Sequence, residues 1–531
     1  MKTVYSPDEI ERILEATIGP AHEPEDLDAD QSRERRRRRA HFIGLVGEQS
    51  AKEVLDIHGD RPGAIVIFAG DDLCGAYALS TASALCALGR HAKVCLFNIG
   101  GNMLSDDCRA ERDRFVQTAG AEWLNEVTDP GASFTMPELD SGMTVVDGLF
   151  GIDYQKPLRG GYQAVARYIN ESPSTPKVVS LDIPSGMNLN LSVGMVNRNI
   201  IHADLTLAIV GPTPAFFMPE NAQLIGRWKT LRLPLDKSVV RHPKCRIVDA
   251  KAIRAVLPPR DPFADKNDLG CVLLFAGSYG MLGAAVLATR SATRSGCGKV
   301  ICHGPRCGFY VLQSSVPSAM YETDGADFDI QRFESQHNAD AIAVGPGLGH
   351  SDATIYGLER FLKTCQAQGR SVILDADALN CMARRPSMLD FLTPGSILTP
   401  HYREFDRLFG TQSSHSTRLL KAIEMAARYK ITIVLKGHYT FTVWPDGEVL
   451  VNASGTDALA TAGSGDVLTG LIAGLAAQHL APEIAAVAGV YLHGIAGKLS
   501  AVRNGVRGTT AEDIADNVGL AIESICNPPS K

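Results

Sequence analysis

The segment 452–475 carries the residues of this chain best suited to chemistry on a phosphate. Gly463, Ser464 and Gly465 form a small-residue turn, and Asp466 then opens a helix rich in Leu, Ile and Ala. A helix start carries free N–H groups and a partial positive charge, so it binds anions, and glycine lets a phosphate approach the backbone closely. An aspartate at this place is either an N-terminal helix charge or a base beside a phosphate or leaving group.

Other turns of the C-terminal half carry similar residues directly beside strand-like segments. Their glycines offer backbone donors, and their acidic, basic and histidine side chains can contact a nucleotide or a cation. The segments are 269–283 (LGCVLLFAGSYGMLG), 345–349 (GPGLG), 374–380 (LDADALN), 398–410 (LTPHYREFDRLFG) and 435–440 (LKGHYT), the last followed by a hairpin turn at 445–447.

The elements that must position these turns alternate between strands and helices in both halves of the chain. Apolar runs predict strands at 64–69, 92–97, 144–146, 177–181, 271–276, 341–344, 371–374, 396–398 and 431–435, with helices at 76–88 and 283–295. This alternation predicts parallel sheets, in which ligands bind at the carboxyl ends of the strands. The corresponding loops of the N-terminal half are 70–78, 147–153, 182–188 and 211–214.

A proline-rich stretch divides the two halves. It opens with Pro234, continues through a basic segment at 237–244, and ends with Pro258, Pro259 and Pro262, which break any regular element. After this stretch the strand and helix rhythm restarts. We therefore predict two α/β domains, one spanning residues 1–240 and the other residues 241–531.

The composition is that of an ordinary soluble protein. Of the 531 residues 45% are apolar and 21% are charged, and the net charge of -7 gives no general attraction for nucleic acid or an anionic membrane. The basic run Arg33–Arg39 follows acidic residues that offset its field, which predicts a solvated helix or linker. The twelve cysteines form no CxxC pair, which predicts reduced, mostly buried thiols in a cytoplasmic protein.

Neither the N-terminal segment nor the longest apolar stretch predicts a membrane-spanning helix. The first nineteen residues predict a polar, amphipathic helix without the apolar core of a secretory signal. The longest apolar stretch, 470–494, is interrupted by His479, Pro482 and Glu483, so we expect that it does not span a bilayer.

The motifs of the C-terminal half resemble those of the ribokinase-like superfamily and, within it, of the ADP-dependent NAD(P)H-hydrate dehydratases. That family typically reads GNPGMATGGTGDVLTG, and this chain reads GTDALATAGSGDVLTG at 455–470. The segment 398–410 resembles LTPHPGEMARLLG, with Tyr402 and Arg403 in place of Pro-Gly, and 435–440 resembles LKGxxT. The resemblance covers residues 265–525 and implies a ribokinase-like, three-layer α/β/α fold.

The resemblance implies a repair reaction, the dehydration of (S)-NAD(P)H-hydrate to NADH or NADPH with ADP or ATP. A phosphate would activate the ring hydroxyl and Asp466 would act as base. Mg²⁺ would accompany the phosphates, with Asp375 and Glu404 as indirect supports. The implied nucleotide contacts are Lys436, Gly437, His438, Tyr439, Thr440 and Gly465, and the implied substrate contacts are Ala284, Gly347, Gly349, His401 and Asp466.

Residues 64–234 resemble the NAD(P)H-hydrate epimerase domain, which often precedes the dehydratase and implies a Rossmann-like three-layer fold. The matching segments are 145–151 (VVDGLFG), 178–188 (VVSLDIPSGMN) and 203–214 (ADLTLAIVGPTP). Asp147, Asp182 and Ser185 survive from the site of that family. The resemblance therefore implies a residual potassium site at Asp147 and Ser185 and a substrate contact at Asp182.

The dinucleotide-binding loop of the epimerase family, GxGNNGGDG, is damaged in this chain. Asp71 and Asp72 place negative charge where a pyrophosphate would lie, at a cost on the order of 1 kcal/mol or more. Cys74 replaces an expected potassium ligand and suits a hard cation poorly, and Thr213 replaces the lysine of GxPK. We predict that this half has lost ordinary epimerase activity and serves as a scaffold or oligomerisation domain of a homo-oligomer.

Two other functions remain open on these residues. A small-molecule kinase of the ribokinase-like superfamily uses the same GSGD site for phosphoryl transfer to an alcohol. A non-enzymatic nucleotide-binding protein would accommodate the substitutions at 456–459 and 402–403. The motifs are compatible with ADP and with ATP, and with hydrated NADH and hydrated NADPH.

Overall fold

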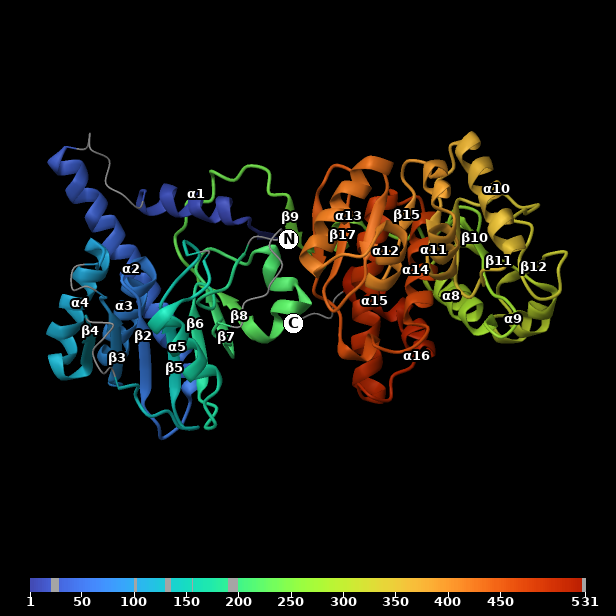
Figure 1. Ribbon diagram of the computed structural model, residues 1–531. Helices are drawn as coiled ribbons and strands as arrows, with labels where there is room; N and C mark the ends of the chain where they lie inside the picture. Colours follow the sequence, from blue (N-terminus) through green and yellow to red (C-terminus); the bar gives the residue numbers. More distant parts are fainter. Residues whose placement is uncertain (21–27, 100–102, 129–134, 155, 190–198, 528–531) are drawn as a thin grey trace. The chain divides into compact units, whose positions relative to one another are not determined.

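The computed structural model describes residues 1–20, 28–99, 103–128, 135–154, 156–189 and 199–527 (Figure 1). The chain divides into two compact units, one of Thr3–Pro243 and the other of Met1–Lys2 with Lys244–Lys531. Each unit contains one sheet covered by helices, so the predicted α/β class is confirmed.

The N-terminal unit is built on seven parallel strands in the order β4-β3-β2-β5-β6-β7-β8. The strands are β2 (Ile65–Ala69), β3 (Ala92–Phe97), β4 (Leu124–Val127), β5 (Thr144–Gly148), β6 (Lys177–Leu181), β7 (Leu205–Ala208) and β8 (Arg227–Thr230). The helices are α1 (Pro7–Ile18), α2 (Ala29–His58), α3 (Leu73–Ala87), α4 (Asp106–Ala119), α5 (Gly160–Asn170) and α6 (Ala222–Ile225). The strand order reverses between β2 and β5, which is where open parallel sheets bind ligands.

Alternating side chains of these strands build the core of the N-terminal unit. On one face Val66, Phe68 and Val145 pack against Val165 and Ile169 of α5. Helices α2 and α3 contact β2, β5 and β6, and α3 also packs against α2 and α4. Because successive residues of a strand point to opposite faces, the fully apolar run of β2 is buried on both sides. The predicted three-layer arrangement is confirmed.

The basic run is more buried than its sequence predicts. It lies on α2, as expected for a helix, but Arg35 and Arg39 are 9% and 7% exposed. Arg39 donates to Asp107 of α4 at 2.8 Å and to the carbonyl of Gly19 at 3.3 Å. The prediction of a solvated run is therefore wrong for these two arginines, because one face of α2 packs against the unit while the rest of the run stays exposed.

Replacing Arg39 by methionine is expected to destabilise the N-terminal unit by about 2–3 kcal/mol, since Asp107 would lose its partner in a largely buried ion pair. Its exposed neighbour Arg38 provides the matched control, and Arg38→Met should change stability by less than about 0.5 kcal/mol. Urea denaturation of the full chain measures both values. Equal effects of the two substitutions would contradict a structural role for Arg39.

The C-terminal unit is built on eleven strands in the order β1-β9-β18-β17-β16-β15-β14-β13-β10-β11-β12. The strands are β1 (Lys2–Val4), β9 (Cys245–Ile247), β10 (Cys271–Phe275), β11 (Lys299–Gly304), β12 (Met320–Thr323), β13 (Ala341–Val344), β14 (Ile373–Leu374), β15 (Ile397–Leu398), β16 (Thr432–Leu435), β17 (Thr440–Val443) and β18 (Val449–Asn452). Strands β10 to β16 pair in parallel, whereas β17 pairs with β16 and β18 in antiparallel fashion around the predicted hairpin turn.

Helices cover both faces of the central strands of this sheet. They are α7 (Ala250–Val256), α8 (Leu282–Arg294), α9 (Phe309–Ser315), α10 (Asp352–Gln368), α11 (Ala376–Arg384), α12 (Tyr402–Phe409), α13 (His415–Tyr429), α14 (Ser464–Ala477), α15 (Pro482–Asn504), α16 (Ala511–Asp516) and α17 (Val518–Cys526). Residues of α8, α14 and α15 share one core with β10, β13 and β16. Helices α10 and α13 contact the opposite face, which completes the predicted three layers.

Two parts of the chain contain short elements that the sequence does not predict. The stretch 234–262 contains β9 and α7, and α7 ends at Val256, before the three prolines that break regular structure. The N-terminus begins with strand β1 before α1, where the sequence predicts helix alone. The short edge strands escape pattern reading because three residues carry too little periodicity to register.

The structure agrees with the expectation of unpaired, mostly buried cysteines. All twelve are free, and eight of them are buried. Among the helices that the structure describes, α15 alone has the length and apolar composition of a membrane span, and 67% of that window is buried inside the fold. Such burial is typical of a helix in the core of a globular unit.

Candidate functional site

The start of α14 forms the centre of the candidate site. Gly463 precedes the helix with a φ of 86°, a left-handed conformation that glycine adopts readily. The helix begins at Ser464, two residues earlier than the sequence predicts, so Asp466 lies in its first turn. The first N–H groups of α14 are therefore free of partners within the helix and available to an anion.

Two neighbouring helices fix this helix start. The Ser464 hydroxyl lies 3.1 Å from Nε2 of His493 on α15, and His493 is buried. Burial lowers the pKa of His493 to about 4, so this imidazole is neutral at pH 7. On the other side Ala288 of α8 approaches so closely that a Cβ at Gly470 would lie 2.0 Å from its carbonyl oxygen. Only glycine fits at that crossing.

A buried ion pair lies directly beside the helix start. Lys436, after β16, donates to Asp375, after β14, at 2.8 Å. The second carboxylate oxygen of Asp375 accepts from the Thr469 hydroxyl at 2.6 Å. A Cβ placed on Gly465 would lie 3.4 Å from the Lys436 ammonium, so this cation faces the first turn of α14. The Lys436 ammonium and the free N–H groups at the start of α14 therefore lie together, where both can contact one anion.

The carboxyl of Asp466 is strongly perturbed. Burial, followed by the nearby charge of Asp375, raises the pKa of Asp466 to about 7. Burial alone would lower the pKa of Lys436, but the charges of Asp375 and Glu404 outweigh it and raise that pKa. The site thus holds a permanent cation next to an acid that exchanges its proton near neutral pH, and such groups mark candidate acid–base sites.

His401 lies at the start of α12, and its backbone forms an isolated β-bridge with that of Lys436. Its Nδ1 accepts from the backbone N–H groups of Arg403 and Glu404 at 3.1 and 3.3 Å, and the Glu404 carboxylate accepts from the backbone N–H of His401 at 2.8 Å. These bonds fix the ring as a helix cap, and Nε2, the remaining ring nitrogen, lies 3.4 Å from the Glu404 carboxylate. Burial and the charge of Lys436 lower the pKa of His401, which favours the neutral form.

The loop after β13 approaches the start of α8. A Cβ on Gly347 would lie 3.0 Å from the Cβ of Ala284, so these two residues are in contact. The Ser278 hydroxyl donates to the Gly347 carbonyl at 2.8 Å, and the N–H of Gly349 donates to Asp377 at 2.9 Å. This loop lies at the reversal of strand order between β10 and β13, where a ligand is expected.

The segment from Lys436 to Thr440 forms the tight turn between β16 and β17. The Thr440 hydroxyl lies 3.3 Å from the Gly437 carbonyl, and the ring of His438 packs edge-on against Tyr439 at 4.7 Å. Gly437 and His438 are exposed, so the turn is open to a ligand on its outer side. Lys436 links this turn to Gly465 and Asp466, so the expected nucleotide contacts lie together.

The three predicted residues of the N-terminal unit lie at the carboxyl ends of β5 and β6. Asp147 is fully buried, and it accepts from Ser180 at 2.8 Å and from the hydroxyl of Ser185 at 2.6 Å. Asp182 has a φ of 66° and accepts from the N–H of Ile152 at 2.9 Å. Burial raises the pKa of Asp182 to about 6.

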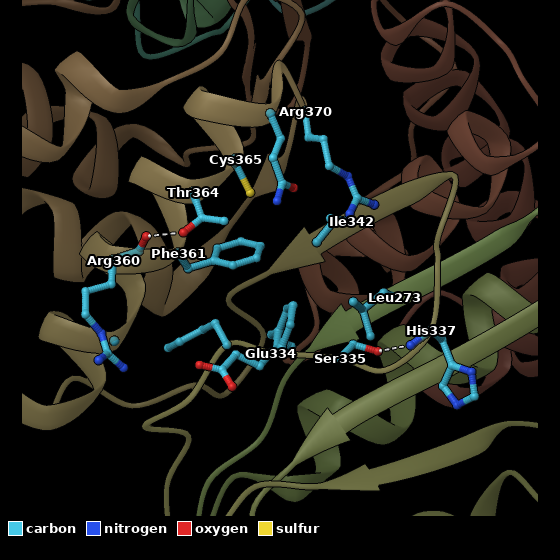
Figure 2. Close-up of a pocket in the computed structure, with 14 residues that line it drawn as sticks. Leu273, Glu334, Ser335, His337, Ile342, Arg360, Phe361, Thr364, Cys365 and Arg370 are labelled. Atoms are coloured by element: carbon cyan, nitrogen blue, oxygen red, sulfur yellow. Dashed lines mark hydrogen bonds between the residues drawn. The ribbon is translucent and has the colours of Figure 1, made fainter.

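A different cavity, of about 460 Å³, lies between α10 and the sheet and is drawn in Figure 2. Leu273 and Ile342 of the sheet point into it, and Phe361 and Cys365 line its other side. None of the predicted substrate or nucleotide residues lines this cavity. It belongs to the packing beneath α10, and the candidate active site lies at the carboxyl ends of the strands.

Each half of the chain matches a known protein family. The sequence family described as NAD(P)H-hydrate dehydratase matches residues 272–519, and the family described as YjeF-related protein N-terminus matches residues 42–215. A bifunctional NAD(P)H-hydrate repair enzyme of Moorella thermoacetica is 34% identical over 396 residues, covering 72% of this chain and 73% of that protein. The chain belongs to the family of bifunctional NAD(P)H-hydrate repair enzymes.

Other members of the family align over greater lengths. The bifunctional repair enzyme of Thermofilum pendens is 30% identical over 490 residues, covering 90% of this chain and 91% of that protein. Among solved structures, an ADP/ATP-dependent NAD(P)H-hydrate dehydratase from Bacillus subtilis, co-crystallised with ATP and Mg²⁺, is 33% identical. It covers 52% of this chain and 97% of its own, with a TM-score of 0.46.

Sequence motifs of this family locate most of the candidate site but miss its supports. Asp466, Lys436 and His401 come from recognised motifs, and the structure brings them to one edge of the sheet. Thr469 belongs to the GSGDVLTG motif, but its bond to Asp375 is not visible in the sequence, and His493, which contacts Ser464, lies outside every motif. The only sequence feature that points to the contact between His493 and Ser464 is a lone histidine in an apolar segment.

Proposed function

We propose that the C-terminal unit, residues 241–531, dehydrates (S)-NAD(P)H-hydrate to NADH or NADPH in a reaction that consumes ADP or ATP. The observation that carries this proposal is Asp466, whose pKa is raised to about 7 in the first turn of α14, beside the ammonium of Lys436. A base that ionises near neutral pH and an anion-binding helix start occupy the same place. Membership of the repair-enzyme family supports the substrate.

Each residue receives a role from its position. Lys436, Gly437, His438, Tyr439 and Thr440 would hold the nucleotide, together with the Gly465 N–H. Lys436 would neutralise phosphate charge, and the turn to β17 would contact the rest of the nucleotide. Transfer of the terminal phosphate of the nucleotide to the ring hydroxyl would release the shortened nucleotide, and the resulting phosphate ester would leave as inorganic phosphate in the elimination.

The substrate would lie between the loop after β13 and the start of α14. Ala284, Gly347 and Gly349 form a wall of small residues, next to which a dinucleotide can approach the backbone. His401, neutral and fixed through Nδ1, would offer Nε2–H to a carbonyl or hydroxyl of the substrate. Asp466 would take the proton released as the ring double bond forms again.

The residues present fit Mg²⁺ bound through phosphates rather than by a protein cage. Within the described residues no group of three or more His, Cys, Asp and Glu side chains is arranged to hold a metal ion. Mg²⁺ usually keeps several waters and binds through one or two carboxylates plus phosphates. Bound in that way it would screen phosphate charge, with Glu404 as a water-mediated support, whereas Asp375 is already bonded to Lys436 and Thr469.

We propose further that residues 1–240 form an epimerase-like domain without ordinary epimerase activity. The residual site at Asp147 and Ser185 does not fit potassium, because the carboxylate oxygens already accept from Ser180 and Ser185 and from the N–H of Leu149. Cys74 offers a neutral thiol there, since burial raises its pKa well above the usual value. We also propose a cytoplasmic homo-oligomer with no nucleic-acid or membrane partner.

The test uses hydrated NADH as a mixture of its epimers, with ADP or ATP and Mg²⁺, followed by the absorbance of reduced nicotinamide. We expect a fast nucleotide-dependent phase for the S epimer and a slow phase at the rate of spontaneous epimerisation. Complete fast recovery would show an active epimerase and contradict the proposal for the N-terminal unit. No recovery with either nucleotide would contradict the dehydratase and favour a small-molecule kinase or a nucleotide-binding protein.

A further inference from the structure

A cavity of about 350 Å³ lies in the N-terminal unit where the carboxyl ends of β2 and β5 meet. This is the reversal of strand order at which parallel sheets bind ligands, and the volume lies within the range of small-molecule sites. Three carboxylates and three aromatic rings line it, and among the described residues none that lines it is basic. The lining residues are Asp71, Asp72, Leu73, Cys74, Leu149, Phe150, Gly151, Asp153, Tyr154 and Tyr162.

The three aromatic rings form one continuous wall. Phe150 stacks on Tyr154 with ring centroids 4.1 Å apart and an interplanar angle of 23°. Tyr162 of α5 meets Phe150 edge-on, at 4.7 Å and 69°. All three side chains are half-buried, so parts of the rings stay accessible from the cavity. Aromatic faces carry negative electrostatic potential and attract a cation within about 6 Å.

The carboxylates reinforce the same preference. Asp71 and Asp72 are adjacent in sequence. Asp72 precedes α3, but its side chain makes no capping hydrogen bond to the helix. Asp153 and the buried Asp182 stand on the neighbouring loops. Asp72 and Asp153 line the same cavity, so their like charges repel each other. Burial and then the charge of Asp72 raise the pKa of Asp153, against the opposing charge of Arg39. A cation between these two carboxylates would relieve that repulsion.

A buried hydroxyl near the cavity also has no partner. Tyr77 is 3% exposed, and its hydroxyl makes no hydrogen bond within the part of the chain that the structure describes. Tyr77 lies three residues after the lining residue Cys74 on α3, and its ring meets Phe42 of α2 edge-on at 6.4 Å. Burial and then the charges of Asp182 and Asp153 raise its pKa, against the opposing charge of Arg39.

We propose that this cavity binds a small organic cation of the quaternary ammonium class, held by the aromatic wall of Phe150, Tyr154 and Tyr162 and by the carboxylates of Asp71, Asp72 and Asp153. The same groups repel the pyrophosphate of a dinucleotide, so the charge preference of the ancestral site is reversed. The N-terminal unit is then a binding module. The proposal does not depend on dehydration in the C-terminal unit.

The test measures the binding of choline to the full chain by ligand-observed NMR, beside its neutral isostere 3,3-dimethylbutan-1-ol. We expect choline to bind at least about ten-fold more tightly than the alcohol, because only the charged form gains from carboxylates and ring faces. Equal binding of the two compounds, or no saturable binding of choline, overturns the proposal. Displacement of choline by ADP-ribose also overturns it, because the cavity would then accept a pyrophosphate.

Matched variants place the binding in this cavity. The double substitution Asp71→Asn and Asp72→Asn should weaken choline binding at least about ten-fold, and Tyr154→Leu should weaken it while keeping an apolar wall. The control carries Glu122→Gln and Glu171→Gln, which remove the same charge from exposed positions at the opposite edge of the sheet. Equal effects of the two double variants overturn the proposal. Unchanged thermal unfolding of each variant confirms that the fold is intact.

Discussion

Replacing Asp466 by asparagine is expected to lower nucleotide-dependent dehydration by at least about 10³-fold, because the variant keeps the shape of the site and loses its base. The recovery of reduced-nicotinamide absorbance measures the loss. In the wild-type protein kcat/KM should rise with pH through about 7, where Asp466 ionises. A variant that keeps more than a tenth of the activity would contradict the assignment of Asp466 as base.

The same substitution is expected to stabilise the C-terminal unit. Asp466 has a pKa of about 7 in the folded chain, above its ordinary value of 3.8, so the folded state holds the proton more tightly. Its contribution to stability is complete below about pH 4 and is lost as the pH rises through about 7. Asparagine never ionises, so Asp466→Asn should gain about 2 kcal/mol at pH 8 and nothing at pH 4, with allowance for partial exposure.

Thermal unfolding at these two pH values tests the gain, and Glu483→Gln is the matched control. Glu483 occupies the first turn of α15, as Asp466 occupies the first turn of α14, but it lies outside the candidate site. The control should keep activity and show no pH-dependent gain. Lower activity coupled to higher stability at pH 8 is the signature of a residue held in an unfavourable environment for function.

The sequence predicts the strands of both sheets because their apolar runs are long enough to show a pattern, as in β3 and β6, whose bounds agree with the prediction. It also predicts the start of α14, where small residues precede an acid. It does not predict contacts between distant segments. Thr469 and Asp375 are 94 residues apart and Ser464 and His493 are 29 apart, so only the packing of helices and strands brings them together.

Burial explains the remaining differences. The run around Arg35 and Arg39 reads as a solvated surface because composition alone does not reveal which face of α2 is covered. The damaged loop at Asp71 predicts a lost phosphate site, but the aromatic wall of the same cavity comes from the loop after β5 and from α5, and only the structure reveals it. The local sequence pattern thus locates the residues that depart from the epimerase motif, whereas the aromatic side chains near them are brought there by tertiary packing.

Replacing Lys436 by methionine is expected to destabilise the C-terminal unit by about 3 kcal/mol, because Asp375 is only 1% exposed and would lose its counter-charge. The loss of the ammonium should also raise the KM for nucleotide by about 100-fold, since a charge-assisted phosphate contact contributes up to about 3 kcal/mol. Urea denaturation and initial rates at varied nucleotide measure the two effects. Lys498→Met, at an exposed position of α15, should change neither.

The double variant Lys436→Met with Asp375→Asn separates the two effects. Asparagine removes the buried charge and can still accept from the Thr469 hydroxyl, so stability should return to within about 1 kcal/mol of wild type. Nucleotide binding should stay weak, because the ammonium that faces Gly465 is still missing. Recovery of both properties would show that Lys436 only neutralises Asp375. Recovery of stability alone assigns the ammonium to the phosphate.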